Sequence, residues 1–186
     1  MIKRDFLLGL LVGVILSGLF TAYYLNLDRS DSTSEKVSQK ISDKSSQEKM
    51  AQAMQDEINK IEDMLKDDPN NIDLLTTLGN YYFDLGKPDK AISTYEKILT
   101  IQPNKAYVWV DCGIMYRQKG NFKKAVDYFN KSLQIQPDYK QALFNKLIVY
   151  RYDLQQMDSA RATFKILENV APNDPHIAAF KSELGL

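Results

Sequence analysis

A repeat with a period of 34 residues constrains the fold of this chain more than any other feature. Gly79 and Gly113 are 34 residues apart, as are Ala91 and Ala125. Three prolines recur at the same interval, namely Pro69, Pro103 and Pro137. Self-similarity at a fixed period of this size indicates a chain built from stacked copies of one small unit. The sequence therefore predicts a repeat architecture.

Each unit contains two helical patterns, because its apolar residues recur at spacings of three and four. In the first unit these residues are Leu75, Leu78 and Tyr82, followed by Ala91, Tyr95 and Ile98. In the second they are Trp109, Cys112 and Tyr116, followed by Ala125, Phe129 and Leu133. Gly86 and Gly120 lie between the two patterns, where a turn with positive φ costs glycine little. Each unit is therefore predicted to be a helical hairpin.

This arrangement of a large residue, Leu-Gly-x-x-Tyr, Ala-x-x-x-Phe and a closing Pro resembles the tetratricopeptide repeat. The resemblance implies an all-α fold, a solenoid of about three helical hairpins with terminal capping helices. The expected repeats cover about 72–105, 106–139 and 140–174, and the expected capping helices cover about 47–67 and 175–184.

The third unit departs from the pattern. Leu147 stands in place of the packing glycine, and the turn sequence DLQQMD lacks glycine. Its closing proline, Pro172, lies 35 residues after Pro137, which indicates one inserted residue. We expect the two helices of this unit to cross at a wider distance.

The N-terminal region predicts a membrane anchor. Residues 6–25 contain no charged side chain, and a helix of this length spans roughly the 30 Å of a bilayer's hydrocarbon core. A cleaved signal peptide is the competing interpretation, but its apolar region normally has about 7–15 residues and ends in a small-x-small site. Lys3 and Arg4 place residues 1–5 in the cytoplasm and the rest outside. The prediction is a single-pass protein of the bacterial inner (cytoplasmic) membrane, with its C-terminal domain on the outer, periplasmic side.

Two further features belong to the anchor and its connection. Gly9 and Gly13 form a G-x-x-x-G pattern that lets two membrane helices approach and form a homo-oligomer, although glycine is common in such helices in any case. Residues 26–46 are rich in Ser, Asp and Lys, so we expect a flexible or weakly helical polar linker. The repeat domain is expected to cover residues 47–186.

Composition argues against several functions. The 24 Lys and Arg residues balance 24 Asp and Glu residues, and no basic stripe favours nucleic acid. The single cysteine, Cys112, and the single histidine, His176, offer no set of metal ligands, and no nucleophile–base pair or phosphate-binding loop is present. Cys112 and Trp109 occupy helical core positions. We therefore predict no enzyme activity, no cofactor and no metal.

The remaining candidate is the groove that stacked hairpins form. In the phase set by the resemblance, the predicted peptide-binding groove contains Asn80, Phe83, Tyr107, Val110, Ile114, Arg117, Gln141, Phe144, Ile148, Arg151 and Tyr152. Aromatic and arginine side chains are enriched at binding surfaces. The alternative for Phe144 or Ile148 is that the C-terminal capping helix covers it as ordinary core.

The family's chaperone-tail binders hold a terminal carboxylate with Lys and Arg at set positions. Thr76, Gln141 and Asn145 stand at such positions here, and only Asn80 agrees. This disfavours a chaperone tail and favours a peptide with apolar side chains and an acidic group or carbonyl facing Arg117 and Arg151.

The predicted function is that of a membrane-anchored scaffold binding a protein or peptide partner. The architecture is similar to that of bacterial proteins assisting cytochrome c biogenesis, and to that of anchored accessories of envelope protein assembly. The alternative is a structural subunit that braces a membrane complex through the opposite face, without peptide capture.

Overall fold

The computed structural model describes residues 29–186, with side chains from residue 48 onward. This part of the chain contains eight α-helices, one π-helix and no strand. The helices are α2 (Arg29–Asp67), α3 (Ile72–Asp84), α4 (Pro88–Ile101), α5 (Ala106–Gln118), α6 (Phe122–Ile135), α7 (Lys140–Ile148), η1 (Val149–Asp153), α8 (Met157–Val170) and α9 (Ile177–Glu183). The chain divides into two compact units, Met1–Ala53 and Met54–Leu186.

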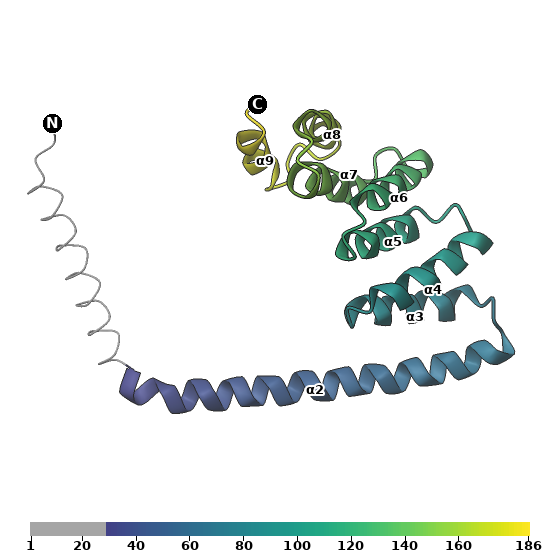
Figure 1. Cartoon of the computed structure of the whole chain (residues 1–186), viewed down its shortest axis with the longest axis vertical. Helices are drawn as coiled ribbons and strands as arrows, with labels where there is room; N and C mark the ends of the chain where they lie inside the picture. Colours follow the sequence, from purple (N-terminus) through teal and green to yellow (C-terminus); the bar gives the residue numbers. More distant parts are fainter. Residues whose placement is uncertain (1–28) are drawn as a thin grey trace, which may run out of the picture. The chain divides into compact units, whose positions relative to one another are not determined.

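Within the second unit, three hairpins follow one another: α3 with α4, α5 with α6, and α7 with α8 (Figure 1). The three hairpins cover residues 72–101, 106–135 and 140–170. The predicted all-α solenoid of helical hairpins is thus confirmed.

Close approach of the paired helices depends on one glycine in each of the first two hairpins. A Cβ atom added to Gly79 would lie 2.5 Å from Cε1 of Tyr95, and one added to Gly113 would lie 2.6 Å from Cε1 of Phe129. Two carbon atoms that are not bonded to each other do not approach this closely. The aromatic ring therefore occupies the space that a side chain would need. The glycine and the ring form one packing unit that repeats after 34 residues.

The inserted residue of the third repeat is accommodated by the π-helix η1. The backbone N–H of Leu154 donates to the carbonyl of Val149, five residues earlier, at 2.9 Å. A π-turn holds one residue more than an α-turn of the same rise. The turn that follows uses Gln155, at φ 55°, where the first two repeats have Gly86 and Gly120.

Helix α2 is longer than predicted at its N-terminus. The predicted capping helix began near residue 47, but α2 begins at Arg29 and includes most of the segment expected to be a flexible or weakly helical linker. No glycine or proline occurs between residues 29 and 67, so nothing interrupts the helical hydrogen bonds. In its last turns, Ile58, Ile61 and Leu65 join the main core cluster of the repeats.

The C-terminal helix α9 packs on the third hairpin. Its Ile177 and Phe180, together with Leu184, form a core cluster with Phe164 of α8 and Leu147 of α7. The helix begins two residues later than predicted. The carboxylate of Asp174 accepts a hydrogen bond from the backbone N–H of His176 at 3.0 Å, just before the helix begins.

Among residues 29–186, no helix combines the length and the apolar character needed to cross a bilayer. The predicted membrane segment, residues 6–25, lies outside the described residues, as do the N-terminus 1–5 and the Gly9–Gly13 pattern.

Candidate functional site

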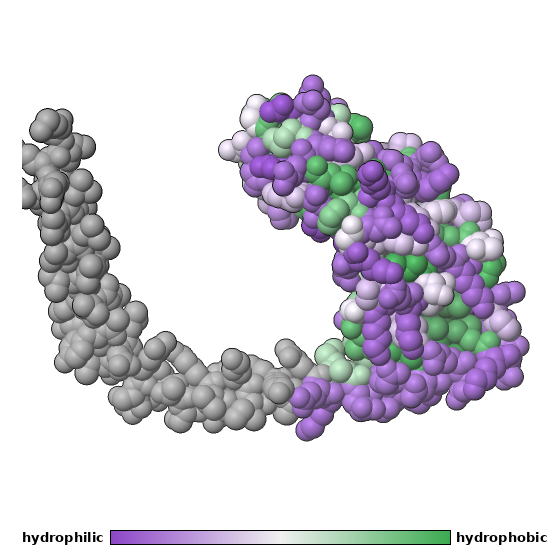
Figure 2. Space-filling model, viewed as in Figure 1, coloured by the Kyte–Doolittle hydropathy of each residue, from purple (hydrophilic) through white to green (hydrophobic). Residues whose placement is uncertain are grey.

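The predicted groove residues come from the first helix of each hairpin, on α3, α5, α7 and η1. Most are exposed or half-buried, and the visible surface of the repeats is mainly hydrophilic with hydrophobic areas among the polar ones (Figure 2). Val110 is the exception, because it is only 1% exposed. Its side chain belongs to the core and is not accessible to a ligand, so the prediction for Val110 is corrected.

A pocket lies between the first two hairpins and contains two of the predicted residues. Asn80 and Phe83 of α3 line it, together with Asp84 of α3, Tyr95 of α4 and Asp111 of α5. Its volume is about 260 Å³. The Tyr95 hydroxyl donates to Oδ1 of Asn80 at 3.0 Å, which fixes one wall.

Asp111 was missed by the sequence interpretation. It follows Val110, and a helix turns by about 100° per residue, so an error of one position exchanges a core side chain for a pocket side chain. Burial raises the pKa of Asp111 to about 6. Within the described part of the chain, no hydrogen bond or ion pair joins its carboxylate to another side chain.

Arg117 of α5 is already paired. Its Nε lies 2.5 Å from Oδ2 of Asp153, and its Nη2 lies 3.4 Å from Oδ1 of the same carboxylate. Asp153 belongs to η1, which holds the inserted residue of the third repeat. The charge that we expected to face an acidic ligand group is therefore largely neutralised by the protein itself.

The other predicted arginine lies on η1. Arg151 is half-buried, and its guanidinium carbon lies 5.3 Å from the centre of the Tyr152 ring. Its Nε has no hydrogen-bond partner among residues 48–186. Tyr152 is 47% exposed, and its hydroxyl donates to Glu183 of α9. These two residues stand together at the edge between the third hairpin and α9.

Helix α9 covers part of the third repeat, as in the alternative considered for Phe144. The Phe144 ring lies edge-on to the rings of His176 and Phe180, each at 5.4 Å between centres. Ile148 packs against the same core cluster. Phe144 and Ile148 therefore contribute to packing of the C-terminal helix, whereas Gln141 is exposed.

Tyr107 and Ile114 come from α5. Tyr107 is 38% exposed, and Nζ of Lys105 lies 5.6 Å from its ring centre. It borders a second hollow, of about 620 Å³, that is also lined by Ile135 and Tyr139. Ile114 is half-buried against the main core cluster.

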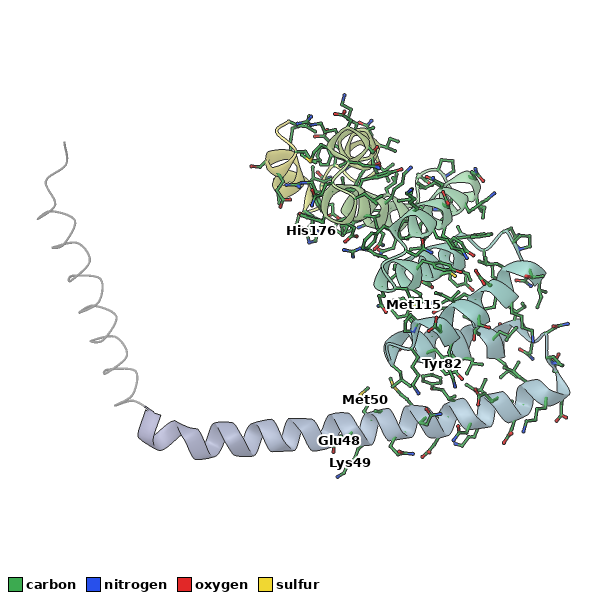
Figure 3. All side chains as sticks on the ribbon, in the orientation of Figure 1. Glu48, Lys49, Met50, Tyr82, Met115 and His176 are labelled. Carbon is green, nitrogen blue, oxygen red and sulfur yellow. The ribbon has the colours of Figure 1, made fainter. Side chains whose placement is uncertain are left out.

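Carboxylate–tyrosine bonds join consecutive hairpins and repeat with the period of the chain. The Tyr116 hydroxyl donates to Glu96 of α4 at 2.6 Å, and Tyr128 donates to the same carboxylate at 2.5 Å. Although burial acts to raise the pKa of Glu96, these bonds and Lys124 hold that pKa below its ordinary value. One repeat earlier, Tyr82 points from α3 toward α2 and donates to Glu62 (Figure 3).

The rare residues of the sequence have structural surroundings. Cys112 is fully buried, and burial raises the pKa of its thiol, so it is a poor nucleophile. Trp109 is half-buried, and its Nε1 donates to the carbonyl of Pro103 at 2.8 Å. Nδ1 of His176 lies 2.9 Å from Oδ1 of Asp174. In the described part, no three His, Cys, Asp or Glu side chains gather as metal ligands.

Comparison with known sequences gives matches to the tetratricopeptide repeat. One model of this repeat matches residues 72–138, and a second matches residues 116–184. Comparison with curated proteins gives no match.

Solved structures with the same fold include a crystal structure of MamA, with a TM-score of 0.65 and 22% identity, covering 75% of this chain and 84% of that chain. The first repeat domain of Spaghetti (RPAP3), bound to the HSP90 peptide SRMEEVD, has a TM-score of 0.57 and 22% identity, covering 61% of this chain and 92% of that chain. The Arabidopsis OM64 repeat domain has a TM-score of 0.56 and 15% identity, covering 61% and 93%.

Proposed function

Because the chain is a tetratricopeptide repeat protein over residues 72–184, we propose that its stacked hairpins act as a scaffold that binds a protein or peptide partner. The main observation in support is that the first helices and η1 expose aromatic side chains that are not buried in the core. Tyr107 and Tyr152 are 38% and 47% exposed. Such side chains supply contact area at low entropic cost and are enriched where proteins bind.

A repeat domain of the same fold, that of Spaghetti (RPAP3), holds a peptide. The groove of the present chain differs from a site built for a terminal carboxylate. Thr76 and Asn145 stand where Lys or Arg would be needed, and Arg117 is paired with Asp153. These residues favour a peptide that is not held by its terminal carboxylate.

Site-specific photocrosslinking of the full chain in its native membrane tests the proposal. A crosslinking amino acid placed at Gln118 or Gln141, both exposed on first helices, is expected to form adducts with a discrete partner. Lys97 and Lys131 are exposed on the second helices and serve as matched controls. Adducts formed from Lys97 and Lys131 alone would support the alternative function, bracing of a membrane complex.

The scaffold is proposed to be anchored in the bacterial inner membrane by residues 6–25, with the repeats on the periplasmic side. The uncharged sequence FLLGLLVGVILSGLFTAYYL supports this. Assistance to cytochrome c biogenesis or envelope protein assembly is the corresponding cellular role. Extraction of membranes at alkaline pH is expected to leave the full chain in the pellet and to release a variant lacking residues 6–25. Release of the full chain would contradict the anchor.

No catalytic activity is part of this proposal. The buried Cys112 and the Asp174-bound His176 lie in different parts of the fold, on α5 and at the start of α9. Among the residues whose side chains are described, neither has a nucleophile–base partner of the kind that catalysis requires.

A further inference from the structure

The pocket between the first two hairpins has a chemical character of its own, and we call it the acidic pocket. It is lined by Asn80, Phe83, Asp84, Tyr95 and Asp111. Because α3, α4 and α5 all contribute, the pocket exists only when two repeats are stacked. Two of its five lining residues are carboxylates and none is a cation.

The Asp111 carboxylate is held in this pocket without a partner. It is half-buried, and in the described part of the chain no donor is bonded to it. A partly desolvated carboxylate without an ion pair is less favourable in the folded protein than in bulk water. The same burial raises the pKa of Asp111 to about 6.

The nearby cations do not compensate it. Helix α3 contains no Lys or Arg. On α5, Arg117 is paired with Asp153. On α4, Nζ of Lys90 lies over the Tyr82 ring, and Lys97 is exposed. The protein therefore leaves the two carboxylates available to a charge from outside.

The size and walls of the acidic pocket define its occupant. Its volume of about 260 Å³ is below the roughly 300–1,000 Å³ of small-molecule sites, so it suits a single side chain. Phe83, which is half-buried, adds an accessible aromatic wall, and the face of an aromatic ring attracts a cation within about 6 Å. The Tyr95 hydroxyl is already bonded to Asn80, so it does not satisfy the carboxylates.

We propose that the acidic pocket receives the side chain of a lysine or arginine from the segment bound in the groove. The carboxylates of Asp84 and Asp111 pair with the cation, while Phe83 contacts its aliphatic stem. This deepens the proposed function, on which it rests, by assigning a basic residue to the partner. It also replaces the acidic ligand group that the sequence favoured.

The test uses two small probes on the full chain in detergent micelles. Butylammonium represents a lysine side chain, and ethylguanidinium represents an arginine side chain, while butanol is the uncharged control. Chemical shifts of the backbone amides of Asp84 and Asp111 report binding in heteronuclear NMR spectra. We expect saturable shifts at millimolar concentration for one or both cations and none for butanol.

Variants link the response to the pocket. Asp84→Asn and Asp111→Asn keep side-chain size and are each expected to weaken cation binding at least tenfold. Asp73→Asn, on the same helix α3 but outside the pocket, is the matched control and should bind as the parent does. Thermal unfolding of each variant verifies that it is folded, and Asp84 is exposed, so its variant is informative even if Asp111→Asn unfolds.

Three results would overturn the assignment. They are the absence of shifts with either cation, equal shifts with butanol and with both cations, and cation binding that is unchanged in the two pocket variants. Failure of the acidic-pocket assignment can be distinguished from failure of the proposed scaffold function. Groove adducts without cation binding would reject the acidic pocket alone, whereas cation binding without groove adducts would reject the scaffold role alone.

Discussion

The carboxylate of Asp153 lies 2.5 Å from Nε of Arg117 and ties the π-helix of the third repeat to the first helix of the second. The Asp153 side chain is 17% exposed, and that of Arg117 is 35% exposed. Such a partly buried, charge-assisted pair is stronger than an ion pair at the surface. The π-helix that holds the inserted residue of the third repeat therefore forms an ion pair with a residue that lies 36 positions earlier in the chain.

We predict that a double-mutant cycle with Arg117→Met and Asp153→Asn gives a coupling energy of about 1–2 kcal/mol. Denaturant unfolding of the four proteins measures it. Lys60 and Glu57, an exposed pair on α2, provide the comparison and should couple by less than about 0.5 kcal/mol. Equal coupling of the two pairs would contradict the stronger role given to Arg117 and Asp153.

The repeats were predictable because their determinants are local and periodic. Gly79 with Tyr95 and Gly113 with Phe129 are spaced identically in sequence, and the structure packs both pairs in the same way. A small residue facing a large ring requires the two helices of a hairpin to be close, whatever surrounds the hairpin.

The groove was less predictable, because a period shows which positions are equivalent but not how far each lies from its neighbours. Thr76, Val110 and Phe144 are equivalent, yet only Val110 is fully buried. Val110 lies in the middle hairpin, which has a hairpin on either side. The spacing of the prolines indicated one extra residue in the third repeat. The sequence did not show that a π-helix would contain this residue and bring Asp153 to Arg117.

We predict that Gly113→Ala lowers the free energy of unfolding by about 1–3 kcal/mol, since its Cβ would meet the Phe129 ring. Urea denaturation at neutral pH measures the loss. Phe129→Leu removes ring atoms from that space, so the double variant should lose less than the sum of the two single variants. A strictly additive result would show that the clash does not cause the loss.

We predict that Gln155→Gly stabilises the protein by about 0.5–1 kcal/mol, because Gln155 has a positive φ that glycine adopts without strain. The midpoint of thermal unfolding should rise accordingly. Gln134, exposed on α6, is the matched control, and its change to glycine should destabilise the helix by up to about 1 kcal/mol. Destabilisation by Gln155→Gly would show that its side chain contributes more than the turn geometry indicates.

The last prediction concerns the pH dependence of stability that Asp111 confers. Its pKa is raised by burial from 3.8 to about 6, so the folded state binds the proton more tightly than the unfolded state does. The contribution of Asp111 to stability is therefore fully present below pH 3.8 and is lost as the pH rises through 6. The Asp111→Asn variant has no ionisable carboxyl group at this position, so its stability does not fall in this way as the pH rises.

The variant should accordingly gain stability relative to the parent between pH 4 and pH 7, by at most about 3 kcal/mol for a shift of this size. Urea unfolding of both proteins across that range measures the difference. The facing groups are Asp84 in the acidic pocket and the hydroxyls of Tyr95 and Tyr139, and neither tyrosine titrates in this range. Asp84→Asn tests whether the two carboxylates are coupled. A stability difference that stays constant from pH 4 to pH 7 would mean that Asp111 is solvated in the folded protein, and it would remove the desolvated carboxylate from the case for the acidic pocket.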